Sequence, residues 1–137
     1  MIVFTNGVFD MFHSAHEKLL EFCAEIAGSD GIVIVGINDD ESVRRLKGPS
    51  RPHNPLSKRM NDVRKFLELR RIRSRVHSFA EGTPAELMER VEYEIDVVVK
   101  GGDYRPEDVV GFGKYDVKIF PFIKGISTTR ILRKIKS

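Results

Sequence analysis

The chain has 137 residues, of which 41% are hydrophobic and 31% charged, and its formal net charge is +3. These values favour one compact domain over residues 1–137 and exclude a disordered or low-complexity chain. The mild excess of basic residues suits an anionic ligand without indicating nucleic acid. There is no run of about 18 apolar residues and no signal-like N-terminus, and the single Cys23 fits a packed core thiol. We therefore expect a cytoplasmic protein without a membrane span.

Strands and helices are predicted to alternate along the chain. The β-rich run 2–5 predicts a strand, apolar residues at helical spacing over 19–27 predict a helix ending at Gly28, and the wholly apolar run 31–37 predicts a central parallel strand. Segment 47–55 contains three prolines and a glycine and predicts a functional loop. The remaining predicted elements are a helix along Leu56, Met60, Val63 and Leu67, a strand 75–79, a helix opened by a capping box at Thr83–Glu86 and continued through Leu87, Met88 and Val91, strands 96–100 and 117–120, and a closing helix 127–135.

This alternation predicts an α/β fold, with a five-stranded parallel sheet and helices on both of its faces. In such folds ligands bind beyond the carboxyl ends of the strands. The residues that follow each predicted strand are therefore the first candidates for a functional site.

The start of the first predicted helix carries two histidines. Residues 6–10 follow the first strand, and His13 and His16 come next. A helix N-terminus attracts phosphate, and side chains three residues apart lie on the same side of a helix. Each imidazole can donate a hydrogen bond to phosphate oxygens that gain charge during a transfer. The alternative is an ordinary cap with two surface histidines, which the presence of two of the chain's four histidines within four residues disfavours.

Three further groups of residues have the chemistry of phosphate binding. Lys47 stands beside Gly48 and can swing a compact charge onto phosphates, and Arg59, one turn into the next helix, can make a bidentate contact. Gly101 and Gly102 follow a strand and allow a ligand to approach the backbone closely. Hydroxyl groups at the start of the closing helix can hold a phosphate, namely those of Ser127, Thr128 and Thr129. The alternatives are solvated charge, a plain turn and a simple helix cap.

Four blocks of the sequence, in order, resemble the cytidylyltransferase-like nucleotidyltransferase superfamily: NGVFDMFHSAH, RRLKGPSRPHNPLSKR, VKGGDY and GISTTRIL. Within it the chain is most similar to the D-glycero-β-D-manno-heptose 1-phosphate adenylyltransferase domain, and next to glycerol-3-phosphate cytidylyltransferase. The resemblance covers nearly the whole chain and implies a single Rossmann-like domain. It implies transfer of AMP from ATP to a sugar 1-phosphate of the heptose type, by direct in-line attack and with release of pyrophosphate.

Carried over by position, the resemblance implies catalytic roles for His13, His16 and Lys47 in contacting the phosphates. Asp10 would shape the phosphate loop, or would act through the Mg²⁺ that the family uses with its NTP; no other direct metal ligand is implied. The other residues implied to bind the nucleotide are Asn6, Gly7, Phe9, Arg59, Gly101, Gly102, Asp103, Ser127, Thr128 and Thr129. The implied partners are ATP, a phosphorylated sugar or polyol and a second copy of the chain in a homodimer, without nucleic acid or membrane.

Departures from the family pattern leave alternatives open. The usual His-x-Gly-His motif has Ala15 at its third position, whose methyl group narrows the approach of a nucleotide, so a non-catalytic nucleotide-binding module remains an alternative. Phe122 and Ile123 stand where glycerol-phosphate cytidylyltransferases carry an Arg-Thr pair, and Gly102 stands where cytidylyltransferases usually have an acidic residue. Both differences favour ATP over CTP. A nucleic-acid-binding protein using the basic segment 64–75 ranks last, because that segment lacks interleaved exposed aromatic residues.

Overall fold

The computed structural model of the chain describes residues 1–80 and 83–121. Its elements are, in chain order, β1 (Ile2–Gly7), α1 (Ser14–Ala27), β2 (Ile32–Asn38), α2 (Asp40–Lys47), α3 (Leu56–Leu69), β3 (Ser74–Phe79), α4 (Ala85–Arg90), β4 (Val97–Gly101), a short 3₁₀ turn (Pro106–Asp108) and β5 (Asp116–Phe120). The predicted closing helix lies outside the described residues. No helix in the described ranges combines the length and the apolar character that crossing a membrane requires.

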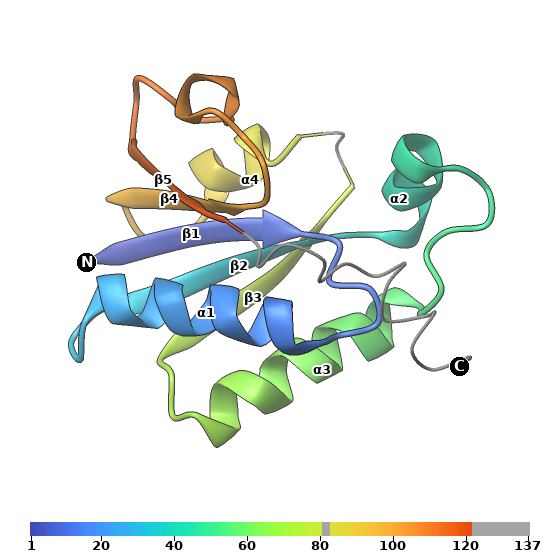
Figure 1. Cartoon of the computed structure of the whole chain (residues 1–137), viewed down its shortest axis with the longest axis horizontal. Helices are drawn as coiled ribbons and strands as arrows, with labels where there is room; N and C mark the ends of the chain where they lie inside the picture. Colours follow the sequence, from blue (N-terminus) through green and yellow to red (C-terminus); the bar gives the residue numbers. More distant parts are fainter. Residues whose placement is uncertain (81–82, 122–137) are drawn as a thin grey trace.

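The five strands form one parallel sheet in the order β3-β2-β1-β4-β5 (Figure 1). Val3 of β1 lies between Val33 of β2 and Val97 of β4, which places β1 at the centre. The chain builds outward from β1 to β3, then crosses back to add β4 and β5 on the other side. The predicted α/β class and five-stranded parallel sheet are confirmed, and the order of the strands reverses between β1 and β4.

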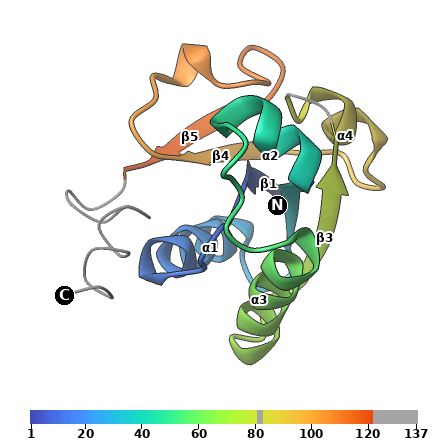
Figure 2. The ribbon, with the colours of Figure 1, turned by 90° about the vertical axis from the view of Figure 1, so that its right-hand side faces the viewer.

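Helices cover both faces of the sheet. α1 and α3 pack on one face, and α4 packs on the other (Figures 1 and 2). β2 is buried at every position because successive side chains point into two separate cores. Val33 and Val35 belong to the core under α1 and α3, whereas Ile34 belongs to the core under α4. This explains why the strand is a continuous apolar run and does not alternate with polar residues.

The helix α2 (Asp40–Lys47) was not predicted from the sequence. Its N-cap is Asp39, whose carboxylate accepts a hydrogen bond from the backbone N–H of Ser42 at 2.8 Å. Among its apolar residues, Val43 is buried and Leu46 is exposed, so there is no apolar stripe from which to detect the helix. As a result Lys47 ends a helix and does not belong to the proline-rich loop that was predicted to include it.

The predicted capping box at Thr83 is wrong. The carbonyl of Pro84 accepts the first helical bond, from the N–H of Met88 at 2.9 Å, so Pro84 itself is the N-cap and no side chain caps α4. The helix α4 covers only Ala85–Arg90. It ends before Val91, which was expected to continue it. Leu87 and Met88 are nevertheless buried against the sheet, so packing holds this helix in place.

Candidate functional site

The carboxyl ends of the strands bring the predicted site residues to one edge of the sheet. Figure 2 looks onto this edge, where the β1–α1 loop, the end of α2, the loop before α3 and the end of β4 meet. The strand order reverses between β1 and β4, so the segments that follow these two strands lead away from each other. In sheets of this kind a crevice that binds a ligand forms at that point. The candidate site is built around this switch point.

His13 and His16 cap the first helix with their own rings. His13 is the N-cap of α1, and its Nδ1 accepts a hydrogen bond from the N–H of Ala15 at 3.2 Å. The N–H of His13 in turn donates to Nδ1 of His16, also at 3.2 Å, and the two rings stack with centroids 3.9 Å apart. A neutral imidazole that accepts at Nδ1 carries its proton at Nε2. Both histidines therefore have an Nε2–H free of the helix cap and able to donate to a ligand.

The surroundings keep both rings uncharged near neutral pH. The pKa of His16 is lowered from 6.5 to about 3, chiefly by burial and also by the charges of His13 and Lys47, while Asp10 acts in the opposite sense. Burial also lowers the pKa of His13. Each histidine is therefore a neutral hydrogen-bond donor, oriented before any ligand arrives. That state suits a group that stabilises developing charge on phosphate oxygens without taking up a proton.

Two lysines add positive charge beside the histidines. Lys47, at the end of α2, is exposed and has no ion pair within the described residues. Lys100 is half-buried at the end of β4, with its Nζ 5.3 Å from the centre of the Tyr104 ring. Burial lowers the pKa of Lys100, and the nearby charge of Lys47 lowers it further. Lys100 was not among the site residues predicted from the sequence, although it is a lysine at the end of a buried apolar strand.

Asp10 holds the loop that precedes α3. Its side chain is buried, and its two carboxylate oxygens accept hydrogen bonds from the backbone N–H groups of His53 at 2.7 Å and Asn54 at 2.9 Å. Of the two roles the resemblance implied, this geometry supports loop shaping, and the loop in question is the proline-rich one. The described part of the chain contains no group of three or more metal-ligating side chains.

Arg59 was expected to support the triphosphate of the nucleotide. In the structure its side chain is fully buried in the floor of the site. Its guanidinium donates to the carbonyls of Asn54 (2.9 Å), Val8 (2.9 Å) and Asn38 (2.8 Å). It also forms a 2.6 Å ion pair with Asp40. Because these partners lie in three separate segments of the chain, Arg59 ties the floor of the site together, and its binding to phosphate stays a prediction.

Phe9, which was also expected to bind the nucleotide, packs in the core. Its ring is 3% exposed, belongs to the core under α1 and α3, and lies 5.2 Å from the ring of His16. A Cβ atom on Gly7 would come within 3.2 Å of the same ring, so Gly7 leaves room for it. Asn6 and Gly7 are half-buried at the end of β1. Phe9 therefore packs against the ring of His16, and Gly7 leaves space for the ring of Phe9.

The end of β4 has the turn geometry that its glycines suggested. Gly101 ends the strand, and Gly102 has a φ of 120°, which a residue with a side chain rarely adopts. The N–H of Gly102 donates to the carbonyl of Phe120 in β5 at 3.0 Å. Asp103 follows and is exposed. The other predicted phosphate-binding residues, Ser127, Thr128 and Thr129, lie outside the described residues.

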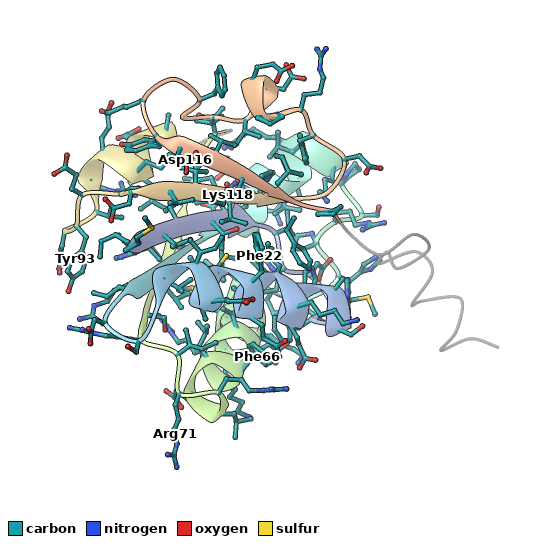
Figure 3. The ribbon with its side chains drawn as sticks, turned by 60° about the vertical axis from the view of Figure 1, so that its left-hand side comes forward. Phe22, Phe66, Arg71, Tyr93, Asp116 and Lys118 are labelled. Atoms are coloured by element: carbon teal, nitrogen blue, oxygen red, sulfur yellow. The ribbon has the colours of Figure 1, made fainter. Side chains whose placement is uncertain are left out.

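A hollow of about 410 Å³ lies at the opposite edge of the sheet, between the ends of α1 and α3. Arg70, Arg71 and Arg73 line it, and Figure 3 shows Arg71 projecting from the body of the molecule. Arg70 is already paired with Glu21 at 3.3 Å. The carbonyl ends of two helices also face this region, and they disfavour anions. None of the predicted site residues lines this hollow, so it is not the phosphate site.

The family of the chain follows from its similarity to known proteins. A family profile described as cytidylyltransferase-like matches residues 4–134. The chain belongs to this family. The predicted family is thereby confirmed, and with it the general class of nucleotidyltransferase.

Curated relatives cover nearly the whole chain. The chain is 39% identical to the Bifunctional protein HldE of Vibrio atlanticus over 98% of its length and 41% identical to that of Photorhabdus laumondii over 99%. The same-named protein of Alcanivorax borkumensis is 43% identical over 98% of this chain. In each case the match spans only 28% of the relative's own length.

Solved structures share the fold at low identity. A protein of unknown function from Archaeoglobus fulgidus superposes with a TM-score of 0.66 at 18% identity, covering 93% of this chain and 94% of the other. A universal stress protein from the same organism gives a TM-score of 0.59 at 16% identity, covering 87% and 92%. At these identities the similarity concerns the fold alone.

Proposed function

We propose that the chain transfers AMP from ATP to a sugar 1-phosphate of the heptose type and releases pyrophosphate. The observation that carries this proposal is the stacked pair His13 and His16, whose Nε2–H donors sit at the switch point of the sheet. Phosphoryl and nucleotidyl transfers need positioning and charge stabilisation more than a nucleophilic side chain. The site supplies neutral donors beside two lysines, which is that kind of chemistry.

The proposed reaction is a single in-line displacement. An oxygen of the acceptor's phosphate attacks the α-phosphorus of ATP, a new P–O bond forms, and the bond to the β-phosphate breaks with its electron pair leaving on pyrophosphate. His13 and His16 donate from Nε2 to oxygens that gain charge in the transition state. Lys47 neutralises phosphate charge beside them. No covalent intermediate with the protein is involved.

The preference for ATP is the finer part of the proposal. Gly102, at the end of β4, offers backbone groups and no side chain, which leaves room for a purine and provides no acidic contact for a cytosine amino group. The other argument from the sequence concerns Phe122 and Ile123, which lie outside the described residues. A cytidylyltransferase acting on glycerol 3-phosphate is the second candidate, and a clear preference for CTP in turnover would favour it.

Ala15 argues less strongly for a non-catalytic module than its sequence position suggested. It is 3% exposed, so its methyl group packs against protein atoms, while its N–H orients His13. The methyl group that Ala15 has in place of the family's glycine is therefore buried in the packing of α1. Turnover itself is the discriminating observation between an enzyme and a binding module.

The proposal also covers the metal ion, the location and the oligomeric state. The proposal includes Mg²⁺, which enters with ATP and is held mainly by the phosphates. The buried free thiol of Cys23, whose pKa burial raises to about 12, is consistent with a cytoplasmic location. A homodimer is also part of the proposal and is tested by size-exclusion chromatography with light scattering.

The deciding experiment is a matrix of NTPs against phosphorylated sugars and polyols, read by pyrophosphate release. We expect the highest kcat/KM with ATP and a heptose 1-phosphate. The matched control is the same matrix with a folded His16→Ala variant, which identifies release caused by a contaminating enzyme. Absence of pyrophosphate release in every combination would overturn the proposal.

A further inference from the structure

Two lysines of the site carry like charges close to one another without a counter-charge. The charge of Lys47 is near enough to Lys100 to lower its pKa, and burial lowers it more. Neither lysine forms an ion pair with any residue in the ranges 1–80 and 83–121. Placing a half-buried lysine beside another lysine costs free energy in the absence of an anion. Such an arrangement is typical of a site that an anion completes.

Lys100 and the helix α2 lie on the opposite side of the sheet from α1, the helix that carries the histidines. Along β4, Val97 and Val99 belong to the core under α1 and α3, whereas Val98 belongs to the core under α4. Because side chains alternate along a strand, Lys100 follows Val98 to the side of α4. α2, which ends at Lys47, lies on that same side (Figure 2). The histidines belong to α1, on the other side.

Lys47 also connects the two sides. Its charge lowers the pKa of His16 as well as that of Lys100, so one cation lies near both groups. An anion held by Lys47 and Lys100 would therefore lie next to an anion held by the histidines. A transfer between two phosphates needs this juxtaposition, because two anionic reactants repel each other unless separate cations hold them in contact.

We infer that Lys100, together with Lys47, binds the phosphate monoester of the acceptor, and that the histidines hold the phosphate that is transferred. This inference rests on the proposed function and identifies the acceptor's part of that site. A phosphate monoester is a dianion near neutral pH, which two ammonium groups match in charge. The α-phosphate of a nucleotide carries a single negative charge, so the neutral Nε2–H donors suit it better. Lys100 thus selects a phosphorylated acceptor over a free sugar or polyol.

The kinetic test replaces Lys100 with methionine, which keeps the length of the side chain and removes its charge. We expect the KM for the acceptor to rise about tenfold to a hundredfold, as loss of a charged hydrogen bond predicts, while the KM for ATP changes less than about twofold. Lys118→Met is the matched control. Lys118 lies on β5 opposite Val99 and pairs with Asp116 (Figure 3). An unchanged acceptor KM in Lys100→Met, or a rise confined to ATP, would overturn the inference.

A second measurement needs no turnover. The lysine ε-methylene signals of the wild-type protein are followed by NMR during titration with inorganic phosphate, with Lys100→Arg used for assignment. We expect the pKa of Lys100 to rise when phosphate binds, because an anion stabilises the charged form. A Lys100 signal that phosphate leaves unmoved contradicts the inference, whether or not the enzyme turns over. If Lys100 responds while wild-type protein releases no pyrophosphate, the anion site stands and the proposed function fails.

Discussion

Two sets of charged side chains lie side by side at the carboxyl edge of the sheet, and their surroundings differ. The first set, which we call the buried polar frame, consists of Asp10, Arg59 and Asp40, joined to one another or to backbone groups by hydrogen bonds of 2.6 to 2.9 Å. The second set, called the cationic rim after its two lysines, consists of Lys47 and Lys100 with the neutral donors His13 and His16. Within the described residues the rim has no acidic ion-pair partner.

The two sets differ in their hydrogen-bond partners: the side chains of the frame bind other protein groups, whereas those of the rim are open to a ligand. Arg59 is fully buried, and four of its hydrogen bonds end on protein groups, so it holds three loops together. His16 and Lys100 are shifted toward their neutral forms by burial, which raises the electrostatic gain from a bound anion. Residue type alone does not distinguish the two roles, since both sets contain groups that are ordinary phosphate ligands.

The largest expected effect is on the buried polar frame. Arg59→Met removes a buried cation and leaves Asp40 and three carbonyls without their partner. We expect the free energy of unfolding to fall by about 3–5 kcal/mol, measured by urea denaturation. Arg64→Met, an exposed position on the same helix, is the control and should change stability by less than about 0.5 kcal/mol. Equal stability of the two variants would mean that Arg59 is free to bind ligand after all.

The next effect is on catalysis by the cationic rim. His16→Ala removes one oriented Nε2–H donor, and we expect kcat to fall by about a hundredfold or more. Circular dichroism confirms that the variant is folded. His77→Ala, a histidine of β3 outside the site, is the control and should keep its kcat. A folded His16→Ala variant with near-normal turnover would remove His16 from the proposed mechanism.

A smaller effect is expected where the frame holds the proline-rich loop. Asp10→Asn keeps one acceptor oxygen and replaces the other with an amide group, so one backbone N–H loses its partner. We expect a loss of about 1–3 kcal/mol in the free energy of unfolding, with faster hydrogen exchange at the amides of His53 and Asn54. Asp116→Asn, exposed on β5, is the control. Unchanged exchange at both amides would show that Asp10 does not hold the loop in solution.

The smallest expected effect is a pH dependence that belongs to the rim. The pKa of His16 is 6.5 when exposed and about 3 in the folded chain. Between these values the unfolded chain binds a proton that the folded chain does not, so stability is lost as pH falls below 6.5. Urea unfolding at pH 7 and pH 4.5 measures this loss, and His16→Ala should lose less stability than the wild type over the same interval. An identical loss in both proteins would contradict the burial of His16.

The sequence by itself determined the alternation of strands and helices, because buried strands and amphipathic helices have apolar periodicities that short windows reveal. It also determined that His13 and His16 begin the first helix after β1. From the parallel sheet followed the edge at which the site lies. These features depend on residues close together in the chain. Within the described residues their prediction failed where local signals were weak, as in the charge-rich α2 and the uncapped start of α4.

Only the tertiary structure decided which charged side chains are buried and which are accessible to a ligand. In the sequence Arg59 looks like its neighbour Arg64, yet Arg59 is fully buried and donates to the carbonyls of Val8 and Asn38, which are 51 and 21 residues away in the chain. Lys100 became part of the site because the chain crosses the sheet before β4 and places that strand beside β1. Hydrogen-bond partners and desolvation arise from contacts between remote segments, and no short window of sequence contains them.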